Sequence, residues 1–369
     1  MVALKHDGNA RAGDTVDSVG ESTLSVGSSV KIHGLQSQRG KSFNGKSGTI
    51  TTELDGETGR HSVRLKGGRV LAVKPANLTL TAAQPAADVK IHCGACERAL
   101  PTDSYSREQG RLRQSMRRCK DCVASGNQLV LMMKGRARSE EDECPICNLP
   151  LPMDENELSL KVCCMKRVCN GCILAARKRG MRDCPFCRTA VPDEASKALA
   201  MVQKRVDAGD PVAIYALGDA CHWGVHGVAR NVTRAVELYE RAAELGFKRA
   251  HYSLGCLYEE GIDVQKDTVK AIRHFEAAAM CGHVSARFNL GCGERNAKNL
   301  SAALQHWIIA AKLGDQHSLS EVKEMFKYGL ATKGDYAESL CGYRSAIEEM
   351  SSPDRDEANA LGHEAIREM

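Results

Sequence analysis

The segment from Cys144 to Arg188 reads CPICNLPLPMDENELSLKVCCMKRVCNGCILAARKRGMRDCPFCR, and its cysteine spacing decides how this part of the chain folds. A tight Cys-x-x-Cys turn brings two thiolates to one metal ion, so two such pairs complete a four-sulfur zinc site. The segment holds three Cys-x-x-Cys pairs and one adjacent pair, which predicts two zinc sites. The eight cysteines are Cys144, Cys147, Cys163, Cys164, Cys169, Cys172, Cys184 and Cys187.

The competing interpretation of these cysteines is a cluster of disulfides, which forms in an oxidising compartment. Residues 1–20 contain no apolar run that could serve as a secretory signal, and no stretch of the chain is apolar for long enough to cross a bilayer. We therefore expect a soluble cytoplasmic or nuclear protein without a membrane partner. In that reducing setting, zinc is the expected partner of the thiols.

The segment resembles the RING finger family, specifically its all-cysteine variants, in its ligand spacing, its CPIC opening and its CPFCR closing. The resemblance implies a cross-brace, in which alternate cysteine pairs bind the same ion. A segment of this size buries too little apolar surface to fold alone, so zinc would provide most of its folding free energy. One ion would be bound by Cys144, Cys147, Cys169 and Cys172, and the other by Cys163, Cys164, Cys184 and Cys187.

The middle of the segment departs from the family pattern. RING fingers usually have Cys-x-His or Cys-x-Cys where this chain has the adjacent Cys163 and Cys164, and Lys166 occupies the place where a histidine often lies. Neighbouring residues can reach one metal ion only where the backbone bends. The second site could therefore use both thiolates in a distorted geometry, or one of them with an outside ligand.

RING fingers perform no covalent chemistry themselves. They bind a ubiquitin-conjugating enzyme charged with ubiquitin and hold the thioester in a reactive pose. By resemblance, Ile146 and Pro185 would form the apolar docking groove and Arg188 would clamp ubiquitin, while Ala176 replaces an aromatic residue that many members have. The alternative makes Ile146 and Pro185 ordinary packing residues and Arg188 a solvated charge.

A second group of cysteines lies upstream, as Cys93-x-x-Cys96 and Cys119-x-x-Cys122. These two pairs predict a third four-sulfur zinc site. The loop between them is basic, and the module resembles, more weakly, the treble-clef or ribbon-like zinc modules of chromatin and RNA-silencing adaptors. Basic runs are commonly solvated, and aromatic residues make up only 4% of the chain, so nucleic acid is disfavoured as a partner.

The C-terminal half predicts a stack of helix pairs. Motifs such as AIYALGDACHWG and AHYSLGCLYEEG each precede an A-x-x-x-[YFW]-x-x-A segment, and they resemble Sel-one-like repeats, relatives of the tetratricopeptide class. Small residues let the helices approach, and an aromatic residue of the next helix fills the gap between layers. The resemblance implies a binding surface for an unidentified protein client. The recurring aromatics are Tyr239, Phe275, Trp307 and Tyr343, and the glycines are Gly218, Gly255 and Gly291.

The predicted fold class is multi-domain: a small β-barrel, two small zinc-stabilised α+β modules, and an all-α solenoid of helix pairs. The barrel is predicted from alternating apolar residues between turns such as Asn44-Gly45, and it resembles Src-homology-3-like barrels. The predicted order is a disordered tail (1–28), the barrel (29–80), a four-cysteine zinc module (90–125), the RING-type finger (140–192), a linking helix (193–208), the solenoid (209–350) and a C-terminal tail (351–369).

These features lead to three hypotheses about function. The first is a RING-type ubiquitin ligase with three Zn²⁺ ions, which docks a ubiquitin-conjugating enzyme and ubiquitin on the RING and a client on the repeats. The second is a non-catalytic scaffold that uses the zinc modules and repeats for assembly. The third is a nucleic-acid-binding adaptor, although a formal charge of +5 on 369 residues is too small to require such a partner.

Overall fold

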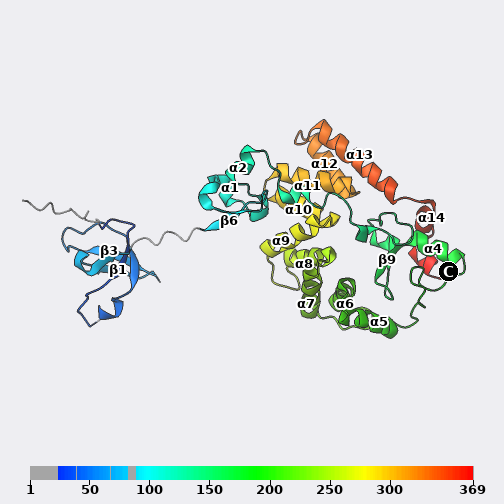
Figure 1. The fold of residues 1–369 in the computed structure, drawn as a ribbon, viewed down its shortest axis with the longest axis horizontal. Helices are drawn as coiled ribbons and strands as arrows, with labels where there is room; N and C mark the ends of the chain where they lie inside the picture. The colour runs from blue at the N-terminus through cyan, green and yellow to red at the C-terminus, as the bar shows by residue number, and fades with distance from the viewer. Residues whose placement is uncertain (1–23, 39, 67, 82–88, 369) are drawn as a thin grey trace, which may run out of the picture. The chain divides into compact units, whose positions relative to one another are not determined.

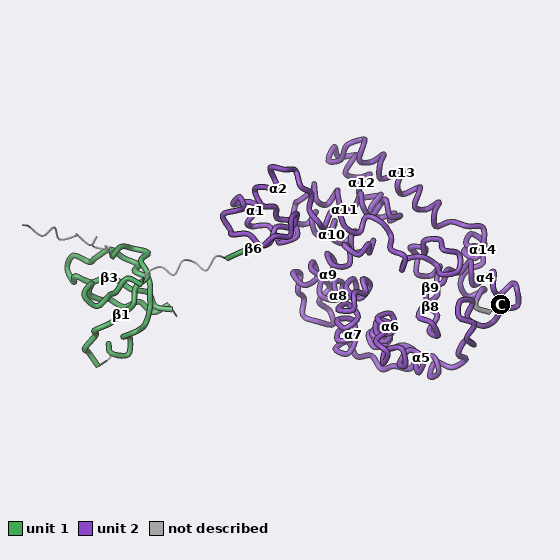
Figure 2. The backbone as a smooth tube through the Cα atoms, in the orientation of Figure 1, with its two compact units in different colours: residues 1–90 green, residues 91–369 purple. Residues whose placement is uncertain are grey.

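The computed structural model describes residues 24–38, 40–66, 68–81 and 89–368, and it divides the chain into two compact units, residues 1–90 and 91–369 (Figures 1 and 2). Most of the predicted N-terminal tail, residues 1–23, lies outside the described ranges. None of the helices within these ranges combines the length and the apolar composition needed to span a bilayer.

The first unit contains a five-stranded antiparallel sheet with the strand order β4-β3-β2-β1-β5. Strand β1 pairs with both β2 and β5, so the first and last strands of the unit are neighbours. Alternate side chains such as Val30, Ile32 and Val63 are buried in one cluster, as the alternating sequence predicts. The strands are β1 (Ser29–Ile32), β2 (Ser47–Ile50), β3 (His61–Leu65), β4 (Val70–Val73) and β5 (Leu78–Leu80).

The second unit begins with the two cysteine-rich parts of the chain. The upstream module contains β6 (Lys90–His92), β7 (Ala99–Pro101), α1 (Arg107–Arg111) and α2 (Lys120–Ala124). A short helix, α3 (Val130–Met133), follows it. The RING-like segment, residues 140–192, contains an antiparallel hairpin and one helix, which are β8 (Leu158–Lys161), β9 (Lys166–Cys169) and α4 (Asn170–Lys178).

The solenoid consists of helices that pack on their neighbours in chain order and follow an arc in Figure 1. Short polar side chains start several of them: Asn231 accepts a hydrogen bond from the Arg234 amide, and Asp267 accepts one from the Lys270 amide, both at 2.9 Å. The helices are α5 (Ala195–Asp207), α6 (Pro211–Trp223), α7 (Val232–Glu244), α8 (Lys248–Glu260), α9 (Thr268–Met280), α10 (Val284–Asn296), α11 (Leu300–Lys312), α12 (Gln316–Lys327) and α13 (Lys333–Met350).

The first three helix pairs pack through the predicted contact of glycine with an aromatic ring. Tyr239, Phe275 and Trp307 are buried, and a Cβ atom added to the facing glycine of the partner helix would lie closer to each ring than van der Waals contact allows. The fourth aromatic, Tyr343, is only half-buried. The regular packing therefore weakens at the end of the stack.

The segment 351–369, expected to be a tail, instead forms α14 (Pro353–Leu361) and α15 (His363–Glu368). Ser352 caps α14, and Pro353 occupies its first turn, where a missing amide costs nothing. Both helices pack on α4, and Figure 1 shows α14 beside it. Ala358 and Ile366 are buried there with Ile173 and Leu174. The C-terminus therefore completes the core of the RING-like segment.

Buried cations attach the cysteine-rich parts to the repeats. Arg287 in α10 is 1% exposed and donates hydrogen bonds to the carbonyls of Leu131 and Lys134, both at 2.6 Å. Lys248, at the start of α8, binds the Asp142 carboxylate at 2.5 Å and the Ser139 hydroxyl at 2.9 Å. The chain between the two cysteine-rich parts thus lies against the first helices of two repeats.

The contact of Gly291 with Trp307 can be tested within one helix. A Cβ at residue 291 would lie 2.6 Å from Trp307 Cδ1, whereas a Cβ at residue 293 would meet nothing within 4 Å. We expect Gly291→Ala to lower the free energy of unfolding by about 1–3 kcal/mol, because the overpacked ring must move. Gly293→Ala should leave it unchanged or raise it by up to about 1 kcal/mol. Chemical denaturation of both variants measures the difference, and equal effects would contradict the packing described.

Two histidines of the second repeat contact each other, with the Nδ1 atoms of His251 and His274 3.0 Å apart. Burial, together with the nearby His251 and Lys270, lowers the pKa of His274 to about 4. In the unfolded chain this pKa is about 6.5, so between these values the native state binds fewer protons than the unfolded state. The contribution of neutral His274 to the free energy of unfolding is therefore fully present above pH 6.5 and is lost as the pH falls toward 4.

We expect His274→Gln to flatten the dependence of the free energy of unfolding on pH between about 6.5 and 4. The control is His317→Gln, which changes an exposed histidine in α12 and should keep the wild-type slope. Denaturant titrations at several pH values give the slopes. The same slope in all three proteins would show that His274 titrates normally in the folded state.

Candidate metal centres

Twelve cysteines form three groups of four, and within each group all sulfur atoms lie within 4.8 Å of one another. None of the 17 cysteines, all of which lie in the described ranges, forms a disulfide. The three groups contain the cysteines named above, and their role as zinc ligands stays a prediction. The groups are centre A (Cys93, Cys96, Cys119 and Cys122), centre B (Cys144, Cys147, Cys169 and Cys172) and centre C (Cys163, Cys164, Cys184 and Cys187).

The sulfur separations suit a tetrahedral zinc ion. Four sulfurs about 2.3 Å from one zinc ion lie about 3.8 Å from each other. In centre B, Cys144 Sγ and Cys172 Sγ are 3.8 Å apart, and so are the sulfurs of Cys147 and Cys169. In centre C the corresponding separations are 3.9 Å for Cys164 with Cys184 and 3.4 Å for Cys163 with Cys187.

One Cys-x-x-Cys pair in each centre forms the same backbone turn. The residue after the second cysteine has a positive φ, and its amide donates to the carbonyl of the first cysteine. A left-handed conformation at residues other than glycine costs energy, which the surrounding structure must offset. The three residues with positive φ are Glu97 (57°), Asn148 (54°) and Arg188 (63°), with amide-to-carbonyl distances of 2.9, 2.8 and 2.9 Å.

In centres A and B the second pair lies at the start of a helix. Cys119 is the N-cap of α2 and Cys169 is the N-cap of α4. The free amides at a helix N-terminus favour negative charge, which zinc-bound thiolates would carry. Centres A and B therefore share one design, a backbone turn that faces a helix N-terminus.

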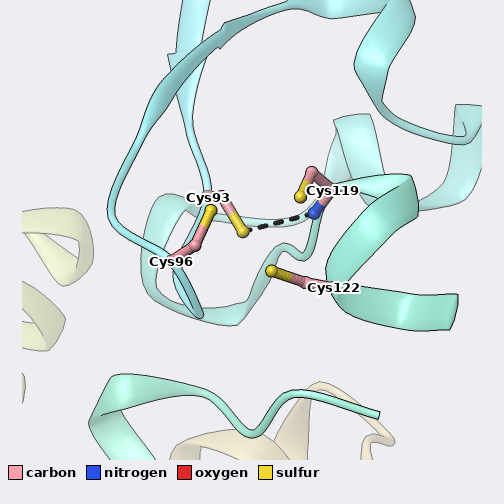
Figure 3. A group of neighbouring side chains, drawn as sticks. All are labelled: Cys93, Cys96, Cys119 and Cys122. Atoms are coloured by element: carbon pink, nitrogen blue, oxygen red, sulfur yellow. Dashed lines mark hydrogen bonds between the residues drawn. The ribbon is translucent and has the colours of Figure 1, made fainter. Parts of the chain in front are cut away.

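Three hydrogen bonds to sulfur are made at centre A. The Cys119 amide donates to Cys93 Sγ at 3.3 Å, as Figure 3 shows. The Asn127 side-chain amide donates to Cys122 Sγ at 3.4 Å. Arg98 Nε donates to Cys96 Sγ at 3.4 Å, and this bond lowers the pKa of Cys96 to about 6. Donors of this kind stabilise the deprotonated form that binds metal.

In centre C both adjacent cysteines reach the group because the β8–β9 turn bends sharply. Met165 has a φ of 54°, and the amides of Cys164 and Met165 both donate to the Lys161 carbonyl, at 3.1 and 2.7 Å. The bend directs Cys163 toward Cys187 and Cys164 toward Cys184. Four sulfurs are thus assembled without a ligand from outside the segment.

The three residues assigned to ubiquitin transfer by resemblance lie beside the metal centres. Ile146 is 38% exposed, Pro185 is half-buried, and Arg188 is exposed, with Nη1 donating to Met181 Sδ at 2.6 Å. Within the described part of the chain, no hydrogen bond joins these three side chains to one another. Ala176, which replaces the family's aromatic residue, is buried.

Sequence reasoning missed the side chains that donate to sulfur at these centres, which are Arg98 and Asn127 at centre A and Arg355 at centre B. Arg355 of α14 donates to Cys147 Sγ at 3.3 Å, although the two residues are 208 positions apart. Arg355 follows a predictable helix start at Ser352 and Pro353, but nothing in its local sequence relates it to a metal centre.

The Sel1 repeat family model matches residues 211–247, 248–283 and 284–315. These residues are similar to Sel1 repeats. The match confirms the predicted repeats over this range, which is the part of the stack where glycine and aromatic residues alternate most regularly. Repeats of this kind stack into extended surfaces that bind other proteins, which supports a protein-interaction scaffold.

Several solved structures are similar to about half of the chain. A Sel1 repeat protein from Oxalobacter formigenes is 22% identical over 52% of this chain and 76% of that chain, with a TM-score of 0.39. The protective antigen c5321 of uropathogenic Escherichia coli, which has an SLR fold, is 17% identical over 52% of this chain and 40% of that one, with a TM-score of 0.37. The immunity protein Pa5087 of Pseudomonas aeruginosa is 17% identical over 57% and 70%, with a TM-score of 0.32. No curated protein matches the chain.

The geometry of centre C predicts equal roles for its adjacent cysteines. We expect Cys163→Ser and Cys164→Ser each to reduce the zinc content by one ion per chain, because three thiolates hold zinc less tightly than four. Cys281→Ser, at an exposed cysteine outside the three groups, should keep the wild-type content. Native mass spectrometry counts the ions. A full complement in either centre C variant would mean that this cysteine is not a ligand.

Proposed function

We propose that this chain is a RING-type ubiquitin ligase, stabilised by three zinc ions and built on a Sel1-repeat scaffold. The observation that carries the proposal is the order of cysteines in the RING-like segment. Centre B takes the first and third pairs along the chain, and centre C takes the second and fourth. This interleaving is the cross-brace that the resemblance to RING fingers implies.

The residues at the three centres fit zinc. Each centre offers only sulfur donors, all within 4.8 Å of one another, a set that zinc binds well and that hard cations avoid. With all four positions taken by protein, such a site is structural and has no open position for a substrate. When bound, zinc would hold the loops that carry its ligands rigidly, and it would take no part in breaking a bond.

The proposed catalysis is positioning by exposed side chains. Ile146 and Pro185 follow the first cysteines of two backbone turns, and they would offer apolar contact to a ubiquitin-conjugating enzyme. Arg188 has its backbone fixed in the left-handed conformation by the third turn, and its exposed guanidinium would restrain ubiquitin. A restrained thioester reacts faster because its orientation is already set.

The proposed client site is on the repeats, but part of their surface is already used. The chain around residues 131–142 lies on α8 and α10, held by Lys248 and Arg287. A cavity of about 420 Å³ remains beside α11, with apolar side chains such as Met116 and Ile309 and the arginines Arg118 and Arg136 in its lining. Such a lining suits a client segment that combines apolar and acidic side chains.

The runner-up is a non-catalytic scaffold, and two observations favour it. The aromatic residue that many RING fingers offer to a conjugating enzyme is replaced by the buried Ala176. In addition, ion pairs join the cysteine-rich parts to the repeats, as a structural brace would: Arg113 with Glu276 and Glu294, and Asp142 with Lys248. The N-terminal sheet, which we propose to be a small barrel of the Src-homology-3-like type, would serve either function as a further docking module.

Nucleic-acid binding is the weakest proposal, because most basic side chains of residues 107–120 are engaged within the protein. Arg113 forms ion pairs with Glu276 and Glu294, at 2.6 and 2.5 Å. The guanidinium of Arg117 donates to the Leu112 carbonyl, and Lys120 donates to the Asp103 carbonyl. These contacts hold the upstream module together and fix it to α9 and α10, leaving few cations for phosphate.

The ligase proposal is tested by reconstitution with activating enzyme, ATP, ubiquitin and a panel of conjugating enzymes. We expect ubiquitin chains to form, and Ile146→Ala and Arg188→Ala to slow their formation by about 10–100-fold through loss of positioning. Matched controls are Met153→Ala, at a residue 37% exposed, and Arg182→Ala, at another exposed arginine; both should act as wild type. No chains with any conjugating enzyme, from protein that retains three zinc ions, would reject the ligase and favour the scaffold.

A further inference from the structure

Arg355 is a buried cation whose negative partner lies in a metal centre. The side chain is 3% exposed, and within the described ranges it forms no ion pair with a carboxylate. Its Nη1 donates to the carbonyls of Pro150 at 2.7 Å and Met350 at 2.5 Å. Its Nη2 donates to Cys147 Sγ at 3.3 Å and to the Leu149 carbonyl at 3.4 Å.

A buried guanidinium needs hydrogen bonds that replace the water it has lost, and a nearby negative charge stabilises it further. Carbonyl oxygens satisfy its hydrogen bonds but carry no net charge, and the hydrogen bonds that the buried Arg287 donates to described residues go only to carbonyls. Arg355 differs because one of its donors reaches a sulfur of centre B. A zinc ion with four thiolates is negatively charged, since the thiolates outweigh the two charges of Zn²⁺, so centre B with zinc bound would supply Arg355 with a counter-charge.

Helix α14 packs against the part of the chain that carries the cysteines of centre B. A Cβ added to Gly171, between the ligands Cys169 and Cys172, would lie 2.8 Å from the Arg355 backbone nitrogen. Farther along, Ala358 of α14 is buried in the core of the RING-like segment, and Glu357 pairs with Lys178 of α4 at 2.5 Å. The absence of a side chain at residue 171 thus lets α14 approach the start of α4.

We propose that Arg355 is the outer-sphere charge partner of zinc at centre B and makes α14 and α15 a zinc-dependent latch. This inference rests on the proposed zinc binding. Coupling between two sites is reciprocal, so α14 docking retains the zinc ion and the zinc ion retains α14. Loss of zinc leaves Arg355 buried beside neutral thiols, and the C-terminal helices then detach and uncover α4. Arg98 at centre A has no such role, because its side chain is 58% exposed and lies two residues from Cys96.

The test uses the full chain and the variants Arg355→Met and Arg355→Lys, with zinc release followed by a chromogenic chelator. Loss of an outer-shell partner typically weakens metal binding by about 10–100-fold. We expect one of the three zinc ions to leave Arg355→Met faster by about that factor, with the other two unchanged and an intermediate effect for Arg355→Lys. Lys178→Met removes an ion pair between the same two helices without touching sulfur. Both side chains are about half exposed (45% and 47%), so the pair contributes little to docking, and the variant should release zinc nearly as wild type does.

Hydrogen exchange of residues 353–368 supplies a second measurement. Removing zinc from wild type should raise exchange there, and Arg355→Met should show raised exchange with zinc present. Ala358→Asp, which forces a charge into the core and detaches α14 without changing Arg355, should release the same zinc ion faster. If Arg355→Met releases zinc and exchanges hydrogen at the same rates as wild type, the latch is overturned. If the wild-type protein itself holds fewer than three zinc ions, the proposed zinc binding is overturned instead.

Discussion

The fold of the RING-like segment depends on four sulfur atoms meeting at each of two points. Centres B and C draw their cysteines from alternate pairs along the chain, so each loop between pairs is fixed at both ends to different centres. The segment has only one hairpin and one nine-residue helix, α4, around a small core. In such a segment the free energy of metal binding contributes directly to folding, because the ligands converge only in the folded chain.

The cysteine-rich parts and the repeats form one connected body within the second unit. Three buried or half-buried cations make the connections, and each uses backbone carbonyls or carboxylates far away in the sequence. Arg113 connects to α9 and α10, Lys248 to Asp142, and Arg287 to α3 and the residue that follows it. The C-terminal helices add a fourth connection, from the end of the solenoid back to α4. The repeats therefore act as a frame that holds the metal centres in fixed positions.

The sequence was sufficient wherever the determining interaction is local or periodic. Cysteine spacing predicted the group of four in the upstream module and eight further cysteines for two sites, while the division of those eight into two groups came from the resemblance to RING fingers. The recurrence of Gly218, Gly255 and Gly291 predicted their contacts with the aromatic rings. The sequence was insufficient for contacts between residues that do not recur at a regular spacing. The docking of α14 depends on Arg355 meeting a sulfur 208 positions away, and the sharp turn at Met165 is not encoded by a glycine. The docking of α14 and the turn at Met165 both depend on tertiary contacts, which the spacing of residues does not predict.

The central claim is that these twelve sulfurs bind zinc, and X-ray absorption at the zinc edge, combined with elemental analysis of freshly purified full-length protein, tests it most directly. The account predicts three zinc ions per chain, each with four sulfur neighbours at about 2.3 Å and no nitrogen or oxygen ligand. Fewer than three ions, a mixed ligand shell, or cysteines joined to one another as disulfides would contradict it.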